Sequence, residues 1–230
     1  KIFGKHYLPN RYGEVFIGID KNIDPRKKKY VATLFQYGFR YGWDYEEVEV
    51  VKKNFPEIRI LRNKGVIDIE RWKKDQAKIN RAHKKGNGYE SYTDGQFIQP
   101  LGITTITDEF NLQRKFLDGV SIHRGTDLKT AVGTPVYAIN SGMVNLADYN
   151  FLLEGNMVIV DHGSGVLSYY LHLSRINVRE GQFVRKGETV ALSGDTGLGV
   201  RYPHLHFAVK VNGISVDPLE FIKTMNQYLK

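Results

Sequence analysis

The chain has 230 residues, of which 41% are hydrophobic and 25% are charged, so a disordered chain, a collagen-like fibre and a disulfide scaffold are excluded. It contains no cysteine, which excludes thiol nucleophiles, Cys-ligated zinc and iron–sulfur clusters and leaves any metal site to His, Asp and Glu. The 33 Lys and Arg residues against 25 Asp and Glu give a net charge of +8, which suggests an anionic partner.

The sequence contains no run of about 18 apolar residues, so no segment is predicted to span a membrane. The chain begins at Lys1 rather than at Met and shows no signal-peptide pattern, and we interpret it as a processed or trimmed fragment. We therefore infer nothing about targeting from its first residues.

The first part of the chain is predicted to form a small β-rich domain followed by a helix. Apolar or alternating residues indicate strands at 14–20, 29–35 and 45–51. A stretch without Gly or Pro predicts a helix over 67–83, and the segment 84–96 is polar and contains Gly, as linkers do. We therefore expect an N-terminal β-rich accessory domain at 1–66 and a helical arm with a polar linker at 67–96.

The second part of the chain, 97–230, is predicted to be an antiparallel β domain. Short strands separated by Gly are expected at 135–139, 156–161, 166–172, 189–193 and 204–211. Asn212-Gly213 is the favoured two-residue hairpin turn. Asp217-Pro218 supplies an N-cap and a first-turn proline for a closing helix over 219–228. The predicted fold class is mainly β, with two β-rich parts.

Histidines are concentrated in this second part, which holds five of the seven in the chain: His123, His162, His172, His204 and His206. In a strand, residues two apart point to the same face, so His204 and His206 project together while Leu205 and Phe207 face the opposite, apolar side. The pair is interpreted either as metal-binding imidazoles or as two ordinary histidines on the polar face of a strand.

His123 and Asp127 are four residues apart, a spacing that keeps both side chains on one side of an extended or a helical segment. Alone they also fit a surface His and an Asp in a turn at Gly125. No His-Glu-x-x-His motif is present, which excludes the usual helical metalloprotease site. Jointly, two imidazoles and one carboxylate form a three-ligand set for catalytic zinc with an open fourth position. A water bound there has a pKa of about 7, and an imidazole is a suitable base for it.

Longer motifs follow one another along the second part. His123-x-x-x-Asp127 and Pro203-His-Leu-His-Phe207 flank Tyr170-Leu-His-Leu-Ser174, and framework segments lie in order at 133–137, 155–163, 181–187, 194–197 and 212–218. Together these motifs resemble the lysostaphin/LytM-type zinc metallopeptidases, which cleave the peptides of bacterial peptidoglycan. The resemblance covers about 97–222.

The resemblance implies that His123, Asp127 and His206 bind one Zn²⁺ and that His172 and His204 lie beside it as catalytic residues. One of these two is implied to act as the general base, and both to stabilise the oxyanion that forms on the peptide carbonyl. The motifs do not assign which histidine has which role.

Three further residues lie in the same motifs. Asn156 and Tyr170 match framework positions near the site, where a packing or turn role fits as well as a functional one. His162 falls in the hairpin turn and is interpreted as structural, since turns favour polar residues that have no function.

The chain departs from the family pattern beside the site. Arg201-Tyr202 stands where many members have Thr-Gly, and Ala208 stands where an acidic residue is frequent. We expect these changes to alter subsite specificity more than activity. No ligand or catalytic position is missing, which argues against the inactive relatives that act as amidase activators.

The positive charge is confined to the N-terminal part. Residues 1–99 hold 21 Lys and Arg against 13 Asp and Glu, a net charge of +8, whereas 100–230 hold 12 of each. No nucleic-acid motif accompanies this charge, so nucleic acid is not an expected partner. Two hypotheses stay open: the basic arm attracts anionic muropeptides, or the N-terminal region, including the linker with Glu90 and Asp94, covers the zinc groove.

We therefore predict a periplasmic, cell-envelope or secreted zinc metalloendopeptidase whose partners are peptidoglycan muropeptides. Its cofactor is one Zn²⁺ per chain, and the D-Ala–diaminopimelate crosslink is the expected substrate because the N-terminal domain and arm resemble that group of members. The alternatives are a glycyl-glycine endopeptidase and a non-catalytic module that binds peptidoglycan or regulates an amidase.

Overall fold

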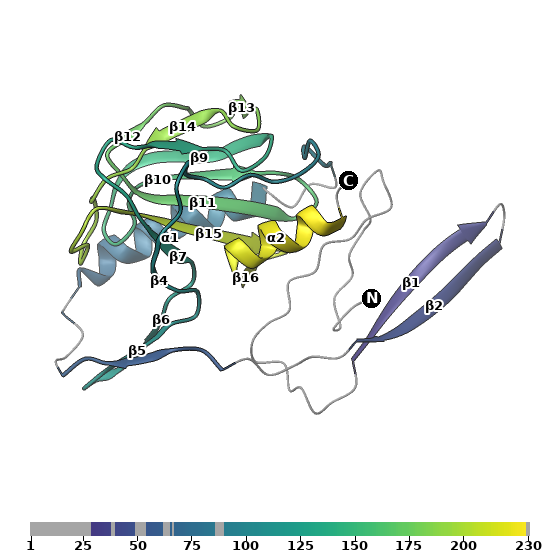
Figure 1. The fold of residues 1–230 in the computed structure, drawn as a ribbon, viewed down its shortest axis with the longest axis horizontal. Coiled ribbons are helices and arrows are strands. Elements are labelled where there is room, and N and C mark those ends of the chain that lie inside the picture. The colour runs from purple at the N-terminus through teal and green to yellow at the C-terminus, as the bar shows by residue number, and fades with distance from the viewer. Residues whose placement is uncertain are drawn as a thin grey trace.

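The structure is a computed structural model of the chain and describes residues 29–37, 40–48, 54–61, 65, 67–85 and 90–228. Within these residues the chain is mainly β, with two helices (Figure 1), which confirms the predicted fold class. Neither helix has the length and apolar character needed to span a membrane.

The first two described strands, β1 (Lys29–Tyr37) and β2 (Arg40–Val48), pair antiparallel. β1 confirms the strand expected at 29–35. β2 overlaps the strand expected at 45–51 only in part, because it begins and ends earlier in the chain. The strand expected at 14–20 lies outside the described residues.

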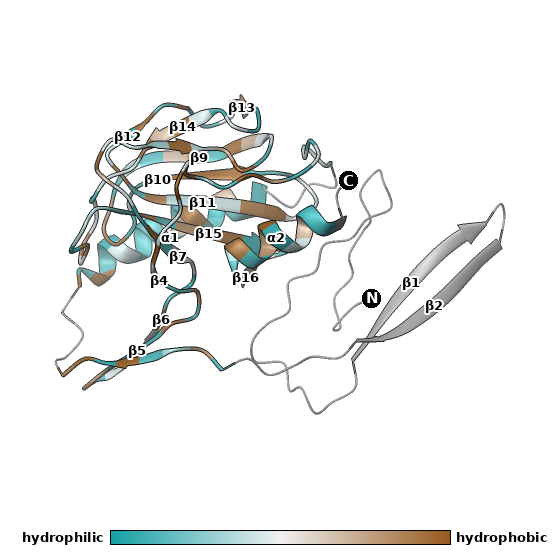
Figure 2. Ribbon diagram, in the orientation of Figure 1, coloured by the Kyte–Doolittle hydropathy of each residue, from teal (hydrophilic) through white to brown (hydrophobic). Residues whose placement is uncertain are grey.

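An eight-stranded antiparallel sheet forms the centre of the fold. Its order is β13 (Phe183–Val184), β9 (Gly142–Phe151), β10 (Gly155–Asp161), β11 (Val166–Leu173), β15 (His204–Val211), β7 (Thr126–Lys129) and β4 (Ile106–Asp108), with β16 (Ile214–Val216) paired to β15. The strands expected at 156–161, 166–172 and 204–211 are confirmed as β10, β11 and β15. Hydrophobic residues concentrate on these central strands (Figure 2), and every residue of β10 is buried.

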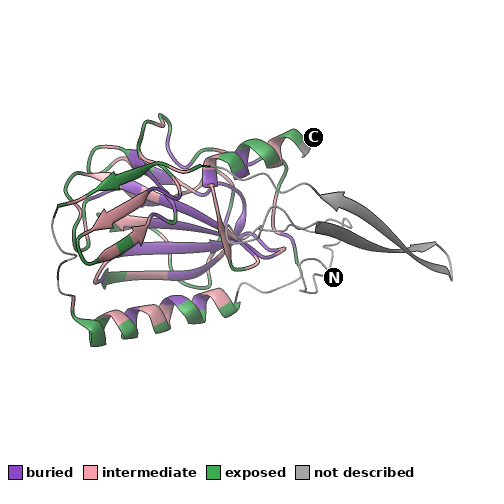
Figure 3. Ribbon diagram, turned by 90° about the horizontal axis from the view of Figure 1, so that it is seen from below, coloured by how far each residue is buried: buried purple, intermediate pink, exposed green. Residues whose placement is uncertain are grey.

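Two hydrophobic clusters cover the two faces of this sheet. One face carries Tyr170 and Phe207, which are fully buried beside the helix α2 (Pro218–Tyr228) and a three-stranded sheet of β12 (Arg175–Ile176), β14 (Thr189–Leu192) and β8 (Pro135–Tyr137). The opposite face carries Tyr169 and Ala208, which pack with the helix α1 (Ile69–Lys85). The two helices therefore lie on opposite sides of the sheet (Figure 3). β8 and β14 confirm the strands expected at 135–139 and 189–193, each slightly shorter.

Helix α1 confirms the helix expected at 67–83. It begins after Asp68, whose Oδ1 accepts a hydrogen bond of 2.9 Å from Arg71 N, as an N-cap does. Its basic last turn complements the helix dipole. Asp75 Oδ2 accepts a hydrogen bond of 2.7 Å from Leu152 N, which ties the helix to the end of β9. α1 thus covers the part of the sheet beside Ala208 and leaves the first residues of β15 uncovered.

A second three-stranded sheet joins the two parts of the chain. It consists of β3 (Glu57–Arg59), β5 (Gln113–Phe116) and β6 (Gly119–Ile122). β3 pairs parallel to β5, while every other pair of described strands is antiparallel. Because β3 belongs to the expected accessory domain and β5 to the expected catalytic domain, backbone hydrogen bonds connect the two; the domain limits themselves stay a prediction.

The C-terminal turn and cap follow the sequence prediction. Asn212 and Gly213 have φ values of 50° and 82°, as both central residues of a type I′ hairpin turn require. Asp217 Oδ1 accepts hydrogen bonds from Leu219 N at 3.1 Å and Glu220 N at 3.3 Å. Both features fix the end of β15 and the start of α2.

His162, in the turn after β10, is fully buried. Its Nδ1 lies 2.9 Å from the carbonyl oxygen of Ser141, and its Nε2 lies 2.8 Å from the Ser168 hydroxyl. That hydroxyl lies 3.0 Å from the hydroxyl of Tyr170, which accepts a hydrogen bond of 3.0 Å from Ile139 N. The structural interpretation of His162 is confirmed, but as a member of a buried hydrogen-bond network and not as a polar residue on a turn.

Candidate metal centre

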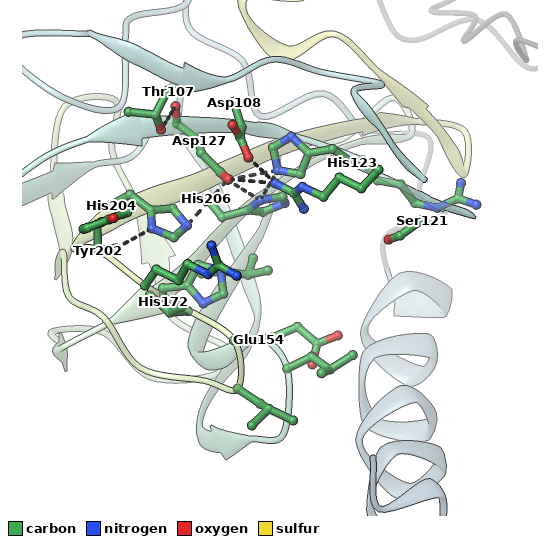
Figure 4. A pocket seen from close by; sticks show the side chains of 18 of the residues that line it. Thr107, Asp108, Ser121, His123, Asp127, Glu154, His172, Tyr202, His204 and His206 are labelled. Atoms are coloured by element: carbon green, nitrogen blue, oxygen red, sulfur yellow. Dashed lines mark hydrogen bonds and ion pairs between the residues drawn. The ribbon is translucent and has the colours of Figure 1, made fainter. Parts of the chain in front are cut away.

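The pairing of β7 with β15 brings the candidate ligands together. Its register sets Asp127 directly opposite His206. His204 and His206 lie on the face of β15 that is partly open, whereas Leu205 and Phe207 are fully buried on the other face. The shared face predicted for the two histidines is therefore confirmed. His123 joins them from the turn before β7 (Figure 4).

Three side chains converge on one point. Asp127 Oδ1 lies 3.0 Å from His123 Nε2 and 2.8 Å from His206 Nδ1, and the two nitrogens are 3.0 Å apart. Burial alone raises the pKa of Asp127, but hydrogen bonds with His123 and His206 outweigh it and hold the pKa well below its usual range. Burial lowers the pKa of His206 despite the carboxylate beside it. A carboxylate and neutral imidazoles are the forms that bind metal ions.

The orientation of His123 is fixed from outside this cluster. Its Nδ1 lies 2.8 Å from the carbonyl oxygen of Glu109. A carbonyl only accepts, so Nδ1 carries a proton, and Nε2 is the nitrogen that would offer a lone pair to a bound metal ion. Gly125 allows the turn to pass close to β15, because a Cβ there would lie 2.6 Å from His206 Nε2 and 2.6 Å from the carbonyl oxygen of Phe207.

Arg114 of β5 contacts the other oxygen of Asp127, and sequence reasoning did not identify it. Its guanidinium forms an ion pair with Asp108 and lies 3.7 Å from Asp127 Oδ2. Arg114 thus occupies the outer side of the carboxylate and leaves Oδ1 directed at the two histidines. No motif surrounds Arg114. All four residues of β5 are half-buried, so the strand has no alternation of buried and exposed residues that would indicate on which face Arg114 lies.

His172 and His204 form the adjacent side of the site, with ring centroids 4.8 Å apart. Nδ1 of His172 lies 2.8 Å from the carbonyl oxygen of Thr196, and Nδ1 of His204 lies 2.8 Å from that of Tyr202. Because both partners are carbonyls, both rings carry the proton on Nδ1 and leave Nε2 as an acceptor. Nε2 of His204 lies 3.6 Å from Asp127 Oδ1, so this acceptor faces the cluster.

The backbone holds His172 in an uncommon conformation. Its φ is 62°, a left-handed value that costs a non-glycine residue of order 1 kcal/mol or more. His172 N donates a hydrogen bond of 3.0 Å to the carbonyl oxygen of Glu154, and Gly194 packs so closely that a Cβ there would lie 2.8 Å from the His172 oxygen. Burial, followed by the charges of His206 and His204, lowers the pKa of His172 to about 3. The ring is therefore neutral and rigidly held.

Asn156 and Tyr170 belong to the motifs that contain the candidate site residues, but neither lines the groove that surrounds the site. Asn156 Nδ2 donates a hydrogen bond of 2.8 Å to the carbonyl oxygen of Leu173, and its Oδ1 accepts one of 3.1 Å from Asn150 N. Tyr170 is fully buried in the network of His162. Both residues support the packing of β10 and β11.

The cluster lies in a groove of about 1830 Å³. The main sheet and the loop before β15 line one side, Trp72 and Gln76 of α1 line another, and Ile58 and Phe116 of the β3–β5–β6 sheet line a third. Gln76 Nε2 donates a hydrogen bond of 2.9 Å to Glu154 Oε1, which links α1 to the main sheet at the edge of the groove; Glu154 lies on the α1 side of the histidines (Figure 4). Residues on both sides of the expected domain boundary therefore form this groove.

The linker hypothesis is wrong for residues 90–96, none of which lines the groove. Ser164 N donates a hydrogen bond of 3.0 Å to the carbonyl oxygen of Glu90, and Asp94 N donates one of 2.8 Å to Asn140 Oδ1. These bonds hold the segment on the turn after β10 and on the residues before β9, away from the candidate ligands.

Comparison with known proteins gives a consistent result. Residues 121–218 match Peptidase family M23. The chain is 38% identical over 121 residues to "Peptidoglycan DD-endopeptidase ShyC" of Vibrio cholerae, covering 52% of this chain and 28% of that protein. It is 35% identical over 147 residues to lysostaphin of Staphylococcus simulans, covering 62% of this chain and 25% of that protein. The chain thus spans about a quarter of the length of these relatives.

Solved structures show the same similarity. A peptidase M23 from Pseudomonas aeruginosa matches with a TM-score of 0.69 over 96% of this chain and 86% of that one, at 24% identity, so the likeness concerns the fold. A zinc containing peptidase from Vibrio cholerae matches with a TM-score of 0.51 at 36% identity, over 54% of this chain and 39% of that one.

Proposed function

We propose that the chain, whose residues 121–218 match Peptidase family M23, is a zinc-dependent endopeptidase that hydrolyses peptide crosslinks of bacterial peptidoglycan. The observation that carries the proposal is the convergence of His123, Asp127 and His206, whose candidate ligand atoms all lie within 4.8 Å of one another. They lie in the groove of about 1830 Å³ described above.

This donor set suits Zn²⁺. Two imidazole nitrogens and one carboxylate oxygen are ligands that zinc accepts, and three protein ligands leave a position for water or substrate. His123, Asp127 and His206 would hold the ion, and partners outside the cluster already orient His123 and Asp127. When bound, zinc supplies Lewis-acid polarisation of a peptide carbonyl and lowers the pKa of water.

His172 and His204 are proposed to handle the protons. Each ring keeps its own proton on Nδ1 against a backbone carbonyl, so Nε2 of either ring can take a proton from the attacking water. Once protonated, the same Nε2–H donates a hydrogen bond to the developing oxyanion or returns the proton to the leaving amine. The close spacing of the two rings lets one accept the proton while the other stabilises the negative charge.

The D-Ala–diaminopimelate crosslink is the proposed substrate, and ShyC, a relative named as a DD-endopeptidase, supports this choice. Such a substrate sets the site of action outside the cytoplasm, in the periplasm, the cell envelope or the medium. The non-catalytic alternative is disfavoured because all five residues of the constellation are present and four of them have interacting nitrogen or oxygen atoms within 3.6 Å.

Digestion of purified sacculi tests the proposal. Zinc-loaded protein is incubated with sacculi that carry diaminopimelate crosslinks and, separately, with sacculi that carry glycine bridges, and the released muropeptides are identified by mass. We expect crosslinked dimers of the first type to be converted to monomers, with loss of activity in chelator. Cleavage of the glycine bridges alone would correct the substrate, and binding to sacculi without any release would favour the non-catalytic module.

A further inference from the structure

Lys129 lies beside the site, and its side chain has no partner among the described residues. It is the last residue of β7, and the strand register sets it directly opposite His204. Residues opposite each other in an antiparallel pair have Cβ atoms about 5 Å apart and share a face, so Lys129 projects from the same face as His204 and Asp127. The Lys129 side chain is exposed, lines the groove and makes no hydrogen bond or ion pair with any described residue.

Arg201 lies on the loop that leads into His204, at a position where the sequence departs from the family pattern. The loop is held at the site, because Nδ1 of His204 donates to the carbonyl oxygen of Tyr202 at 2.8 Å and Leu198 N donates to that of Leu152 at 2.8 Å. Arg201 is exposed, lines the groove and, within the described part of the chain, has no acidic partner.

The acidic residues of the groove do not offset these two cations. Asp127 belongs to the metal cluster and Asp108 forms an ion pair with Arg114. Glu154 lies on the α1 side, where burial raises its pKa and Gln76 hydrogen-bonds it. Among the described residues, Lys129 and Arg201 therefore remain uncompensated next to the proposed catalytic histidines, and the exposed Arg124, which follows His123, adds a third cation to the groove.

We propose that Lys129 and Arg201 bind a free carboxylate of the substrate that lies next to the scissile peptide bond. The inference rests on the proposed function and specifies which crosslink it acts on. In a D-Ala–diaminopimelate crosslink, the nitrogen of the scissile bond is attached to a carbon that also bears a free carboxylate. A glycyl-glycine bridge has no side-chain carboxylate at that point, so these two cations select the first substrate.

Amidation of that single carboxylate tests the inference. Two synthetic crosslinked peptides are compared, identical except that the diaminopimelate carboxylate beside the scissile bond is free in one and amidated in the other. Binding is measured calorimetrically in a His172→Ala background, where the peptide is not consumed, and cleavage is measured in the parent chain. Lys129→Ala, Arg201→Ala and the double variant are compared with Arg175→Ala, which removes an exposed cation of β12 that lies outside the groove and has no acidic partner among the described residues.

The free peptide is expected to bind at least about tenfold more tightly than the amidated one, as charge-assisted hydrogen bonds predict. The double variant should lose this preference through weaker binding of the free peptide, each single variant should lose part of it, and Arg175→Ala should keep it. Equal binding of the two peptides, or an equal loss in Arg175→Ala, would overturn the inference. If the parent chain cleaves the free and the amidated peptide equally well, the inference is refuted but the proposed function is kept. If the chain binds the free peptide more tightly but cleaves neither, the proposed function is refuted and the carboxylate site is kept.

Discussion

Acid should destabilise the fold through His162. The pKa of this buried imidazole is lowered by burial from 6.5 to about 4, whereas in the unfolded chain it keeps its ordinary value. Between these two values only the unfolded state takes up the proton, so the free energy of unfolding falls as the pH is lowered from 6.5 to 4. The gap between the two pKa values corresponds to about 3 kcal/mol lost by pH 4.

Urea unfolding of the parent chain and of His162→Gln measures this loss. The titrations are made at pH 7, 5.5 and 4 in the presence of chelator, so that release of a metal ion does not contribute. Gln cannot be protonated, and His83, whose pKa burial also lowers to about 4, affects both proteins equally. We expect His162→Gln to be the less stable protein at pH 7, by about 1–3 kcal/mol from its lost hydrogen bonds.

From pH 7 to pH 4 the parent chain should lose about 3 kcal/mol more than His162→Gln, so the difference in the free energy of unfolding between the two proteins should vanish or change sign. A constant difference across this range would refute the reasoning, because it would mean that His162 takes up its proton equally in the folded and unfolded states. The loss of stability in acid would then have to arise at other groups.

Three further predictions concern the site and its supports. His206→Ala should lose both zinc, measured by elemental analysis, and crosslink cleavage, whereas His172→Ala should lose cleavage and keep zinc. Gly125→Ala should lower the zinc affinity at least about tenfold in a competition titration, because its Cβ would clash with His206; Gly102→Ala, which meets nothing within 4 Å, is its control. Asp217→Ala should lower the free energy of unfolding by about 1 kcal/mol through loss of the cap of α2.

Each of these predictions has a result that contradicts it. Zinc bound at full stoichiometry by His206→Ala would remove that residue from the ligand set. Equal zinc affinity in the two glycine variants would mean that the turn does not need its close approach to β15. An unchanged free energy of unfolding in Asp217→Ala would mean that water replaces the cap without cost.

The sequence was sufficient for β15 because the two-residue period of a strand does not depend on its neighbours. Alternation of Leu205 and Phe207 with His204 and His206 fixed which face each side chain occupies, and the structure has the same arrangement. The turn at Asn212-Gly213 was equally readable, since its positive φ values restrict the residues that can occupy it.

Strand β9 could not be recognised in this way. Its Asn145 and Asp148 interrupt the apolar pattern, and their partners come from α1: Asn145 Nδ2 donates to the carbonyl oxygen of Ala82 at 3.2 Å, and Lys78 donates to Asp148 at 2.6 Å. Polar residues become acceptable in a covered strand once a distant helix supplies hydrogen bonds. A pattern confined to neighbouring residues contains no sign of that helix.

The candidate ligands were identifiable from motifs, whereas the residues that orient them were not. Glu109 supports His123 through its backbone carbonyl, which any residue type provides. Arg114 reaches Asp127 only because β5 and β6 fold back as a hairpin beside β7. Such supports depend on tertiary structure, and the same holds for Lys129, which lies beside His204 through strand register alone.

Hydrolysis of a D-Ala–diaminopimelate dimer in ¹⁸O-labelled water tests the central claim most directly. The zinc-loaded chain is expected to release two monomers, with one ¹⁸O atom in the carboxyl group of the D-Ala that formed the crosslink, and chelator should abolish the reaction. Three results would contradict the claim that this chain is a zinc endopeptidase of peptidoglycan crosslinks: an intact dimer, ¹⁸O in a carboxyl group formed by cleavage of another bond, or undiminished cleavage in chelator.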